Sequence, residues 1–207
     1  MRIPSTGLLL VLLAGCAATP LPPPAMPAEQ AWLQRETELR LLESWTLSGR
    51  LAISNGDEAW NASLYWSQHP EGYEISVVAP LGGGSLQLRG GAGGVVLQTS
   101  DDGLYQAQDP DALILEVLGL QIPVSGLRYW VLGMPQSGVA RTISLDPWGR
   151  LAELQQADWR VEFLRYRETN GGSLPDKLFM RNEHFEVRLV ISDWELPALP
   201  LPAQARR

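Results

Sequence analysis

The chain contains one cysteine, Cys16, and only two histidines among its 207 residues. A single thiol cannot build a disulfide framework or a zinc site made of thiolates. Two histidines leave little material for a multi-histidine metal site or a Ser-His-Asp enzyme. Basic residues number 16 against 23 acidic ones, and the formal net charge is −7, which argues against a nucleic-acid binder. Composition therefore favours binding over catalysis.

The N-terminal apolar run, residues 7–13, is much shorter than the ~20 residues that a membrane-spanning helix needs. It follows a short basic start and precedes two small residues, as in a signal peptide. The segment Leu13-Ala14-Gly15-Cys16 resembles the bacterial lipobox, in which the cysteine is acylated and the chain is cut before it. The alternative is a plain secretory signal that ends in cysteine. We expect removal of residues 1–15, with N-acyl and S-diacylglycerol groups on Cys16 and no other cofactor.

Several acyl chains together hold a protein firmly at a bilayer. Residue 17 is alanine rather than aspartate, which by analogy with enterobacterial sorting points to the outer membrane. Residues 16–28 are proline-rich and predict an extended tether, and residues 196–207 predict a proline-rich tail. We expect a lipid-anchored outer-membrane protein of a Gram-negative bacterium, with one folded domain (residues 29–195) facing the periplasm.

Three helices are predicted in this domain: Glu29–Glu43, a helix between Asp109-Pro110 and Gly119, and a short one containing residues 127–132. Alternation of apolar and polar residues predicts eleven strands, near residues 45–53, 60–66, 73–77, 86–88, 95–97, 104–105, 140–145, 150–156, 159–166, 177–181 and 185–193. Short connections make neighbouring strands antiparallel.

An antiparallel sheet of this many strands must curl, close or split. Its apolar face needs a cover, and the helices are the only one available. We therefore predict a mainly β, α+β fold with a curved, barrel-like sheet and helices on its concave side. Loose packing there would leave an apolar cavity. Charged residues along 160–167 and 183–188 favour a soluble domain over a membrane barrel.

Eight tryptophans are many for this length. Core and rim packing is the simplest explanation for any one of them. Together, wide side chains on a curved sheet suit a pocket for long hydrocarbon. We predict that Trp60, Leu64, Trp66 and Trp130 line that pocket.

The segment Ala79–Ser85 is rich in proline and glycine and lies between two strands. No lysine or helix follows as in a phosphate-binding loop, and Ser85 lacks the glycine expected after a catalytic serine. An ordinary hairpin loop is the simpler interpretation. However, Leu81 between Pro80 and Gly82 would project without burial, and one leucine entering a bilayer gains only about 0.5 kcal/mol.

An ordered set of segments resembles the LolB family of outer-membrane lipoprotein receptors across about residues 29–195. They are Trp45–Ile53, Trp66 with Gln68, Pro80-Leu81-Gly82, the positions from Gly119 to Pro135, and Asp146, Gly149–Leu151, Gln156, Trp159, Leu174-Pro175 and Trp194. Asp158 departs from the pattern, which has glycine or asparagine before the tryptophan.

The resemblance implies an unclosed barrel of eleven antiparallel strands with a helical lid over an apolar cavity. It also implies a non-enzymatic, monomeric receptor that takes lipoproteins from the periplasmic carrier LolA and releases them into the inner leaflet of the outer membrane. Leu81 matches the protruding leucine that matters for release in the family. The alternative is a lipidated assembly factor with a filled core that binds a protein partner. An esterase-like enzyme lacks a recognisable nucleophile and base.

Overall fold

The computed structural model describes residues 26–197, so the predicted signal peptide, Cys16, most of the tether and all but two residues of the tail lie outside the described residues. Three α-helices and eleven strands follow the predicted order. The helices are α1 (Ala28–Leu39), α2 (Pro110–Leu118) and α3 (Val124–Trp130). The strands are β1 (Trp45–Ser54), β2 (Ala59–His69), β3 (Gly72–Val78), β4 (Ser85–Gly91), β5 (Gly94–Thr99), β6 (Leu104–Ala107), β7 (Arg141–Leu145), β8 (Leu151–Gln156), β9 (Trp159–Thr169), β10 (Gly172–Arg181) and β11 (Glu186–Glu195).

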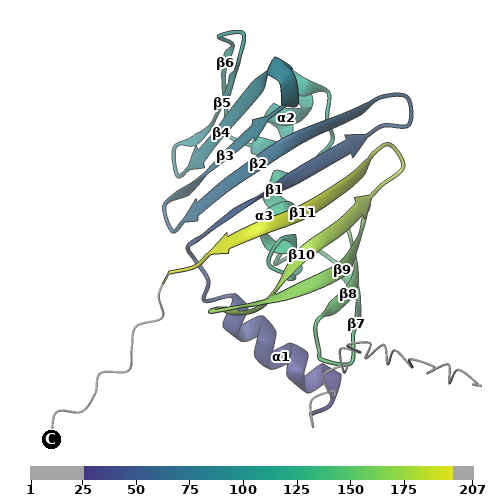
Figure 1. Cartoon of the computed structure of the whole chain (residues 1–207). Coiled ribbons are helices and arrows are strands. Elements are labelled where there is room, and N and C mark those ends of the chain that lie inside the picture. Colours follow the sequence, from purple (N-terminus) through teal and green to yellow (C-terminus); the bar gives the residue numbers. More distant parts are fainter. Residues whose placement is uncertain (1–25, 198–207) are drawn as a thin grey trace, which may run out of the picture.

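All eleven strands form one antiparallel sheet in the order β6-β5-β4-β3-β2-β1-β11-β10-β9-β8-β7 (Figure 1). Every neighbouring pair except β1 and β11 is joined by a short connection, and these two bring the halves of the chain together. The edge strands β6 and β7 do not pair with each other, so the barrel is unclosed. The predicted fold class is confirmed.

The helices α2 and α3 lie in the connection between the two edge strands. We call residues 110–130, which contain both helices and their linker, the lid. Asp109 caps α2, because its side chain accepts hydrogen bonds from the backbone N–H groups of Asp111 and Ala112. Gly119 ends α2 in the left-handed conformation that glycine adopts readily. The lid therefore bridges the open side of the sheet.

Three predicted boundaries were wrong. The short third helix, expected to contain residues 127–132, spans Val124–Trp130. The first helix ends at Leu39 rather than Glu43, because Leu41 and Leu42 donate backbone hydrogen bonds three residues back in a tight turn that leads into β1. The tenth strand begins at Gly172 rather than Lys177. It contains Pro175, which has no N–H to donate, at a shift in the register with β9 where regular pairing is interrupted.

Candidate functional site

An apolar cavity of about 110 Å³ lies between the lid and the sheet. All eighteen residues that line it are hydrophobic; they come from the strands β1–β4, β10 and β11, from the lid and from Val131 directly after it. Leu88 and Leu189 stand on the sheet side, and Ile114 and Leu127 on the lid side. Because no charged residue contributes to its wall, the cavity suits hydrocarbon.

The cavity is small compared with the space that a long acyl chain needs. An enclosed apolar space of about 150 Å³ holds a molecule the size of benzene. The cavity is smaller than that, so a long acyl chain enters only if the lid moves away from the sheet. In this structure the space between the lid and the sheet is therefore too small for a long acyl chain.

A larger groove of about 520 Å³ adjoins the cavity. The cavity and the groove share six of their lining residues: Leu51, Ile53, Val77, Leu86, Leu118 and Leu120. The outer part of the groove is lined by four connections at one end of the strands, which we call the mouth: 55–58, 79–84, 100–103 and 182–185. The six shared residues thus mark the place where the inner cavity continues into the outer groove.

The predicted lining residues fall in three places. Leu64 and Trp66 on β2 line the cavity. Trp60, at the start of the same strand, lines the groove instead and is 42% exposed. Trp130 is not among the lining residues of either space. It lies roughly a quarter turn around α3 from Leu127 and Val131, which do face the cavity.

Trp130 instead belongs to a buried hydrogen-bonded anchor of the lid. Its Nε1–H donates to the Oε1 atom of Gln156 at 3.0 Å, and the backbone N–H of Gln136 donates to the same oxygen at 2.8 Å. The Nε2 group of Gln156 donates to the carbonyls of Gln136 and Val139. One buried amide on β8 therefore fixes the C-terminal end of α3 and the segment that follows it.

The two helices of the lid are also joined to each other. Asp111 on α2 accepts a hydrogen bond from the backbone N–H of Ser125 at 3.0 Å and another from its hydroxyl group. The linker of residues 119–123 lies between these helices and contributes Leu120 and Ile122 to the cavity wall. These apolar residues were missed as site residues, although apolar side chains alternate at 118, 120, 122 and 124, because Gly119 and Pro123 made the segment look like a plain connection.

Leu81 occupies an unusual place beside the mouth. Its side chain is fully exposed, with a relative accessibility of 105%. Its backbone is left-handed, with φ 54° and ψ 32°, which costs a leucine about 1–2 kcal/mol. Pro80 and Gly82 belong to the same short helical turn, and the backbone N–H of Ala79 donates to the Gly84 carbonyl at 2.9 Å to close the loop.

Two unfavourable features at one residue point to a role outside folding. Glycine or asparagine adopts a left-handed backbone more easily than leucine, and a polar residue is preferred on a surface. Neither the conformation nor the exposure of Leu81 stabilises the domain. The loop therefore leaves an apolar side chain fully exposed.

The buried polar groups near α1 have a structural role. Arg150 lies 4.5 Å from the ring centre of Tyr166 and donates from Nε to Asp146 Oδ2 at 2.7 Å. Burial lowers the pKa of Arg35 and raises that of Tyr166. A Cβ atom on Gly149 would lie 2.8 Å from the backbone nitrogen of Trp32. This close packing holds α1 on the turn between β7 and β8.

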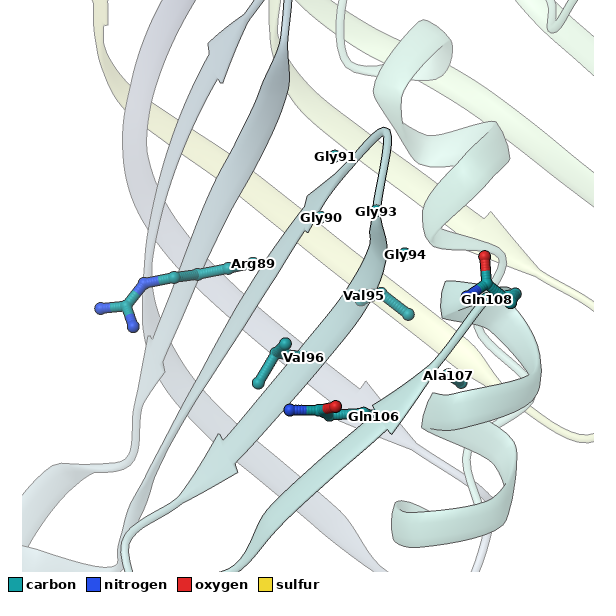
Figure 2. Close-up of a pocket in the computed structure, with 10 residues that line it drawn as sticks. All are labelled: Arg89, Gly90, Gly91, Gly93, Gly94, Val95, Val96, Gln106, Ala107 and Gln108. Carbon is teal, nitrogen blue, oxygen red and sulfur yellow. The ribbon is translucent and has the colours of Figure 1, made fainter.

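A further hollow of about 520 Å³ lies beside the glycine-rich turn between β4 and β5 (Figure 2). Glycine is needed there: a Cβ on Gly90 would lie 2.3 Å from Tyr73 Cζ, and one on Gly94 would lie 2.6 Å from the Ala107 carbonyl oxygen. Arg89 is its one charged residue; Figure 2 shows its side chain extending away from Gln108, and it pairs with Glu74 at 3.2 Å. This hollow is a result of strand packing rather than a second binding site.

Residues 26–197 contain no group of three or more His, Cys, Asp or Glu side chains placed to hold a metal ion. Within the same range, no helix is both long and apolar enough to cross a bilayer.

The architecture and the apolar cavity define the chain as a protein with a LolA-like fold. A LolA superfamily protein from Nitrosomonas europaea matches with a TM-score of 0.58 and 9% identity, over 85% of this chain and 96% of that one. A DUF1329 family protein from Desulfovibrio piger matches with a TM-score of 0.53 and 8% identity, over 84% of this chain and 93% of that one. At such low identity these matches show the fold alone.

Sequence comparison identifies the family. Residues 43–194 match the family model described as outer membrane lipoprotein LolB. Proteins named outer-membrane lipoprotein LolB are 39% identical in Nitrosococcus oceani, over 90% of this chain and 94% of that protein, and 37% identical in Ectopseudomonas mendocina, over 90% and 93%. The chain belongs to the LolB family, which consists of non-enzymatic outer-membrane lipoproteins of the Lol pathway. The predicted family and localisation are confirmed.

Proposed function

We propose that this protein accepts lipoproteins from a LolA-type periplasmic carrier and inserts them into the inner leaflet of the outer membrane. Their acyl chains occupy the cavity under the lid, the protein is anchored through acylated Cys16, and it acts as a monomer. The observation that carries this proposal is the closed apolar cavity and its continuity with a groove that opens beside Leu81.

The path of the cargo follows from that continuity. An acyl chain bound between the lid and β2 leaves past Leu118 and Leu120 into the groove, and from there past residues 79–84. Leu81 stands outside this exit with its side chain in solvent. It is therefore positioned to disturb the bilayer at the point where the chain emerges.

Transfer runs in one direction if the affinity for acyl chains increases at each step. Acyl chains must prefer this cavity to the carrier's cavity, and a bilayer to both, so that each step is downhill. The need to open the lid lowers the apparent affinity of this cavity, because binding requires the less populated open state. A closed lid over a small cavity therefore favours release once a bilayer is within reach.

The direct test is transfer from a purified carrier–lipoprotein complex to the soluble domain, residues 17–207, followed by pull-down. We expect lipoprotein to move one to one without nucleotide. A folded domain that takes up no cargo would contradict the proposal and favour the alternative of a lipidated assembly factor that binds a protein partner.

The cavity is tested by a matched pair of variants on β3. Val77→Phe adds a ring to a residue that lines both cavity and groove. Val78→Phe adds the same ring to the next residue, which is 41% exposed on the other face of the strand. We expect only Val77→Phe to reduce uptake of cargo. Equal uptake by both variants would show that acyl chains bind elsewhere.

The exit is tested by Leu81→Glu, with Leu33→Glu as the control on α1, where Leu33 is 63% exposed. Leu81→Glu should leave folding and uptake unchanged and leave lipoproteins unincorporated in added vesicles. Leu33→Glu should behave as the wild type in both steps. Normal incorporation by Leu81→Glu would refute the role of the loop.

A further inference from the structure

One edge of the sheet, the strand β6, is exposed. This strand pairs with β5, and its other side faces no strand among the described residues. Leu104, Tyr105 and Gln106 in it are exposed, and Ala107 is half-buried. The strand contains no charged residue and no proline. It therefore lacks the side chains that usually keep an edge strand from pairing with another chain.

The opposite edge of the sheet is protected. The strand β7 begins with Arg141, whose Nη2 atom lies 3.4 Å from the Oε1 atom of Glu36 on α1. The helix α1 packs against this strand, and a register shift after Ser144 interrupts the pairing with β8. Figure 1 shows β7 and α1 at the lower end of the molecule and β6 at its upper end. Of the two edges, β6 is thus the one that can accept another strand.

The backbone groups on the free side of β6 follow from its pairing with β5. The N–H of Thr99 donates to the carbonyl of Gly103 at 3.0 Å, so these two residues form a hydrogen-bonded pair. Such pairs alternate with non-bonded ones along an antiparallel ladder. Tyr105 therefore bonds to β5, whereas the N–H and C=O groups of Leu104 and Gln106 point away from it. Two donors and two acceptors thus face outward, as in the sheet edges that bind extended peptides.

This free edge begins at the mouth. Leu104 directly follows the connection 100–103, and Ser100 in that connection lines the groove. The backbone N–H of Ser100 donates to the carbonyl of Ser85 at 2.9 Å, which holds the connection against the end of the 79–84 loop. A chain that leaves the groove at the mouth is therefore adjacent to the start of β6, whose four residues rise about 13 Å.

We propose that the free edge of β6 binds the polypeptide of the cargo: the extended segment that follows the acylated residue of a lipoprotein pairs with Leu104 and Gln106 as an added strand. This proposal rests on the proposed function, because acyl chains held in the cavity leave the residues attached to them at the mouth. Pairing through main-chain groups requires no particular side chains. Lipoproteins of different sequence are therefore held in the same way.

The charges beside this edge define the segment further. Asp101 and Asp102 precede β6, Asp109 and Asp111 follow it, and residues 100–112 contain no lysine or arginine. A basic segment is therefore attracted to the edge and an acidic one is repelled. We expect a lipoprotein with two lysines in this segment to be taken up about two- to fivefold better than one with two glutamates, and high salt to reduce the difference. Equal uptake at low salt would contradict this placement.

Cross-linking tests the pairing directly. Cys16 is the only cysteine of the chain, and we expect its sulfur to carry diacylglycerol, so Gln106→Cys provides a single free thiol in the lipidated protein. A triacylated lipoprotein is loaded from its carrier with one further cysteine, placed in turn at each residue from about the third to the eighth. We expect disulfides at alternate positions, because every second side chain of an added strand lies on the face of Gln106. Thr142→Cys, exposed on β7, is the control and should form none.

The alternation distinguishes pairing from proximity. Disulfides at every position would show a linker that passes the edge without pairing, and none, or equal yields at Thr142→Cys, would show that it leaves elsewhere; each result would overturn the proposal. Disulfides between two copies of this chain in place of the mixed product would also overturn it, since the edge would then serve self-association. Failure of the wild type to take up cargo would instead refute the proposed function itself.

Amide hydrogen exchange, resolved by residue, tests the same pairing without a substitution. The N–H groups of Leu104 and Gln106 point away from β5, whereas that of Tyr105 donates to it. We expect exchange at Leu104 and Gln106 to slow by about tenfold or more when cargo is loaded, and exchange at Tyr105 to stay unchanged. Unchanged exchange at all three residues in the loaded protein would overturn the proposal.

Discussion

Leu81→Asn should make the domain more stable and the protein less active. The left-handed backbone at this residue costs leucine about 1–2 kcal/mol, whereas asparagine adopts it readily. The side chain is fully exposed, so the substitution removes no buried apolar contact. We expect the free energy of unfolding to rise by about 1 kcal/mol, which corresponds to an increase in Tm of about 2–4 °C for a chain of this size.

The same substitution separates two explanations of what Leu81 does during release. If the leucine only partitions into the bilayer, losing about 0.5 kcal/mol should slow incorporation roughly twofold. A much larger loss would mean that it disturbs the lipid packing as the cargo leaves. Thermal unfolding followed by circular dichroism and lipoprotein incorporation into vesicles measure the two effects. A fall in Tm would refute the reasoning, because Leu81 would then make a stabilising contact.

Two further substitutions test the buried polar groups. Gln156→Leu removes the hydrogen bonds that fix the end of the lid and should lower the free energy of unfolding in urea by about 3–4 kcal/mol; a loss below about 1 kcal/mol would show that the anchor is dispensable. Tyr73 has a buried hydroxyl group without a partner among the described residues, so Tyr73→Phe should stabilise the domain by about 1 kcal/mol at pH 7. Burial raises the pKa of Tyr73 from 10 to about 12, so the unfolded chain ionises at a lower pH than the folded domain, and the free energy of unfolding is unaffected below pH 10 and falls as pH rises toward 12. Between pH 9 and pH 11, the free energy of unfolding in urea should fall less in Tyr73→Phe than in the wild type. Equal falls in the two proteins would contradict this.

The strands could be predicted because alternation with a period of two is a local property of the sequence. The same alternation placed Leu64 and Trp66 on one face of β2, and that face does line the cavity. It could not show how far the cavity extends along the strand, and Trp60 lies beyond it in the groove. Which face of the sheet is concave depends on twist and on the pairing of β1 with β11, which are properties of the whole chain.

The lid was harder to predict for a physical reason. The phase of a seven-residue helix is set by what it packs against, and Trp130 turns toward Gln156 on β8, a partner distant in sequence. The linker between the two helices is too short to assign to a strand or a helix from its pattern, although its Leu120 and Ile122 complete the cavity wall. Leu81 was identified from its neighbours, Pro80 and Gly82, because a loop between them leaves its side chain nothing to pack against.

Loosening the lid should strengthen the binding of cargo, whereas most destabilising substitutions weaken binding. Asp111 holds α2 to α3 through two hydrogen bonds from Ser125. Asp111→Ala removes both bonds, each worth about 1 kcal/mol. If the lid opens by separating α2 from α3, this should raise the population of the open lid by about tenfold or more.

Because acyl chains bind the open state, a looser lid should increase the apparent affinity for cargo and slow its release to vesicles. Ser125→Ala removes only the bond from the hydroxyl group and should give an intermediate effect. Release rates and uptake from the carrier, measured in the same assay, check this order. If Asp111→Ala instead weakens uptake and leaves release unchanged, the lid serves to shape the cavity rather than to set its affinity, and closure contributes nothing to the direction of transfer.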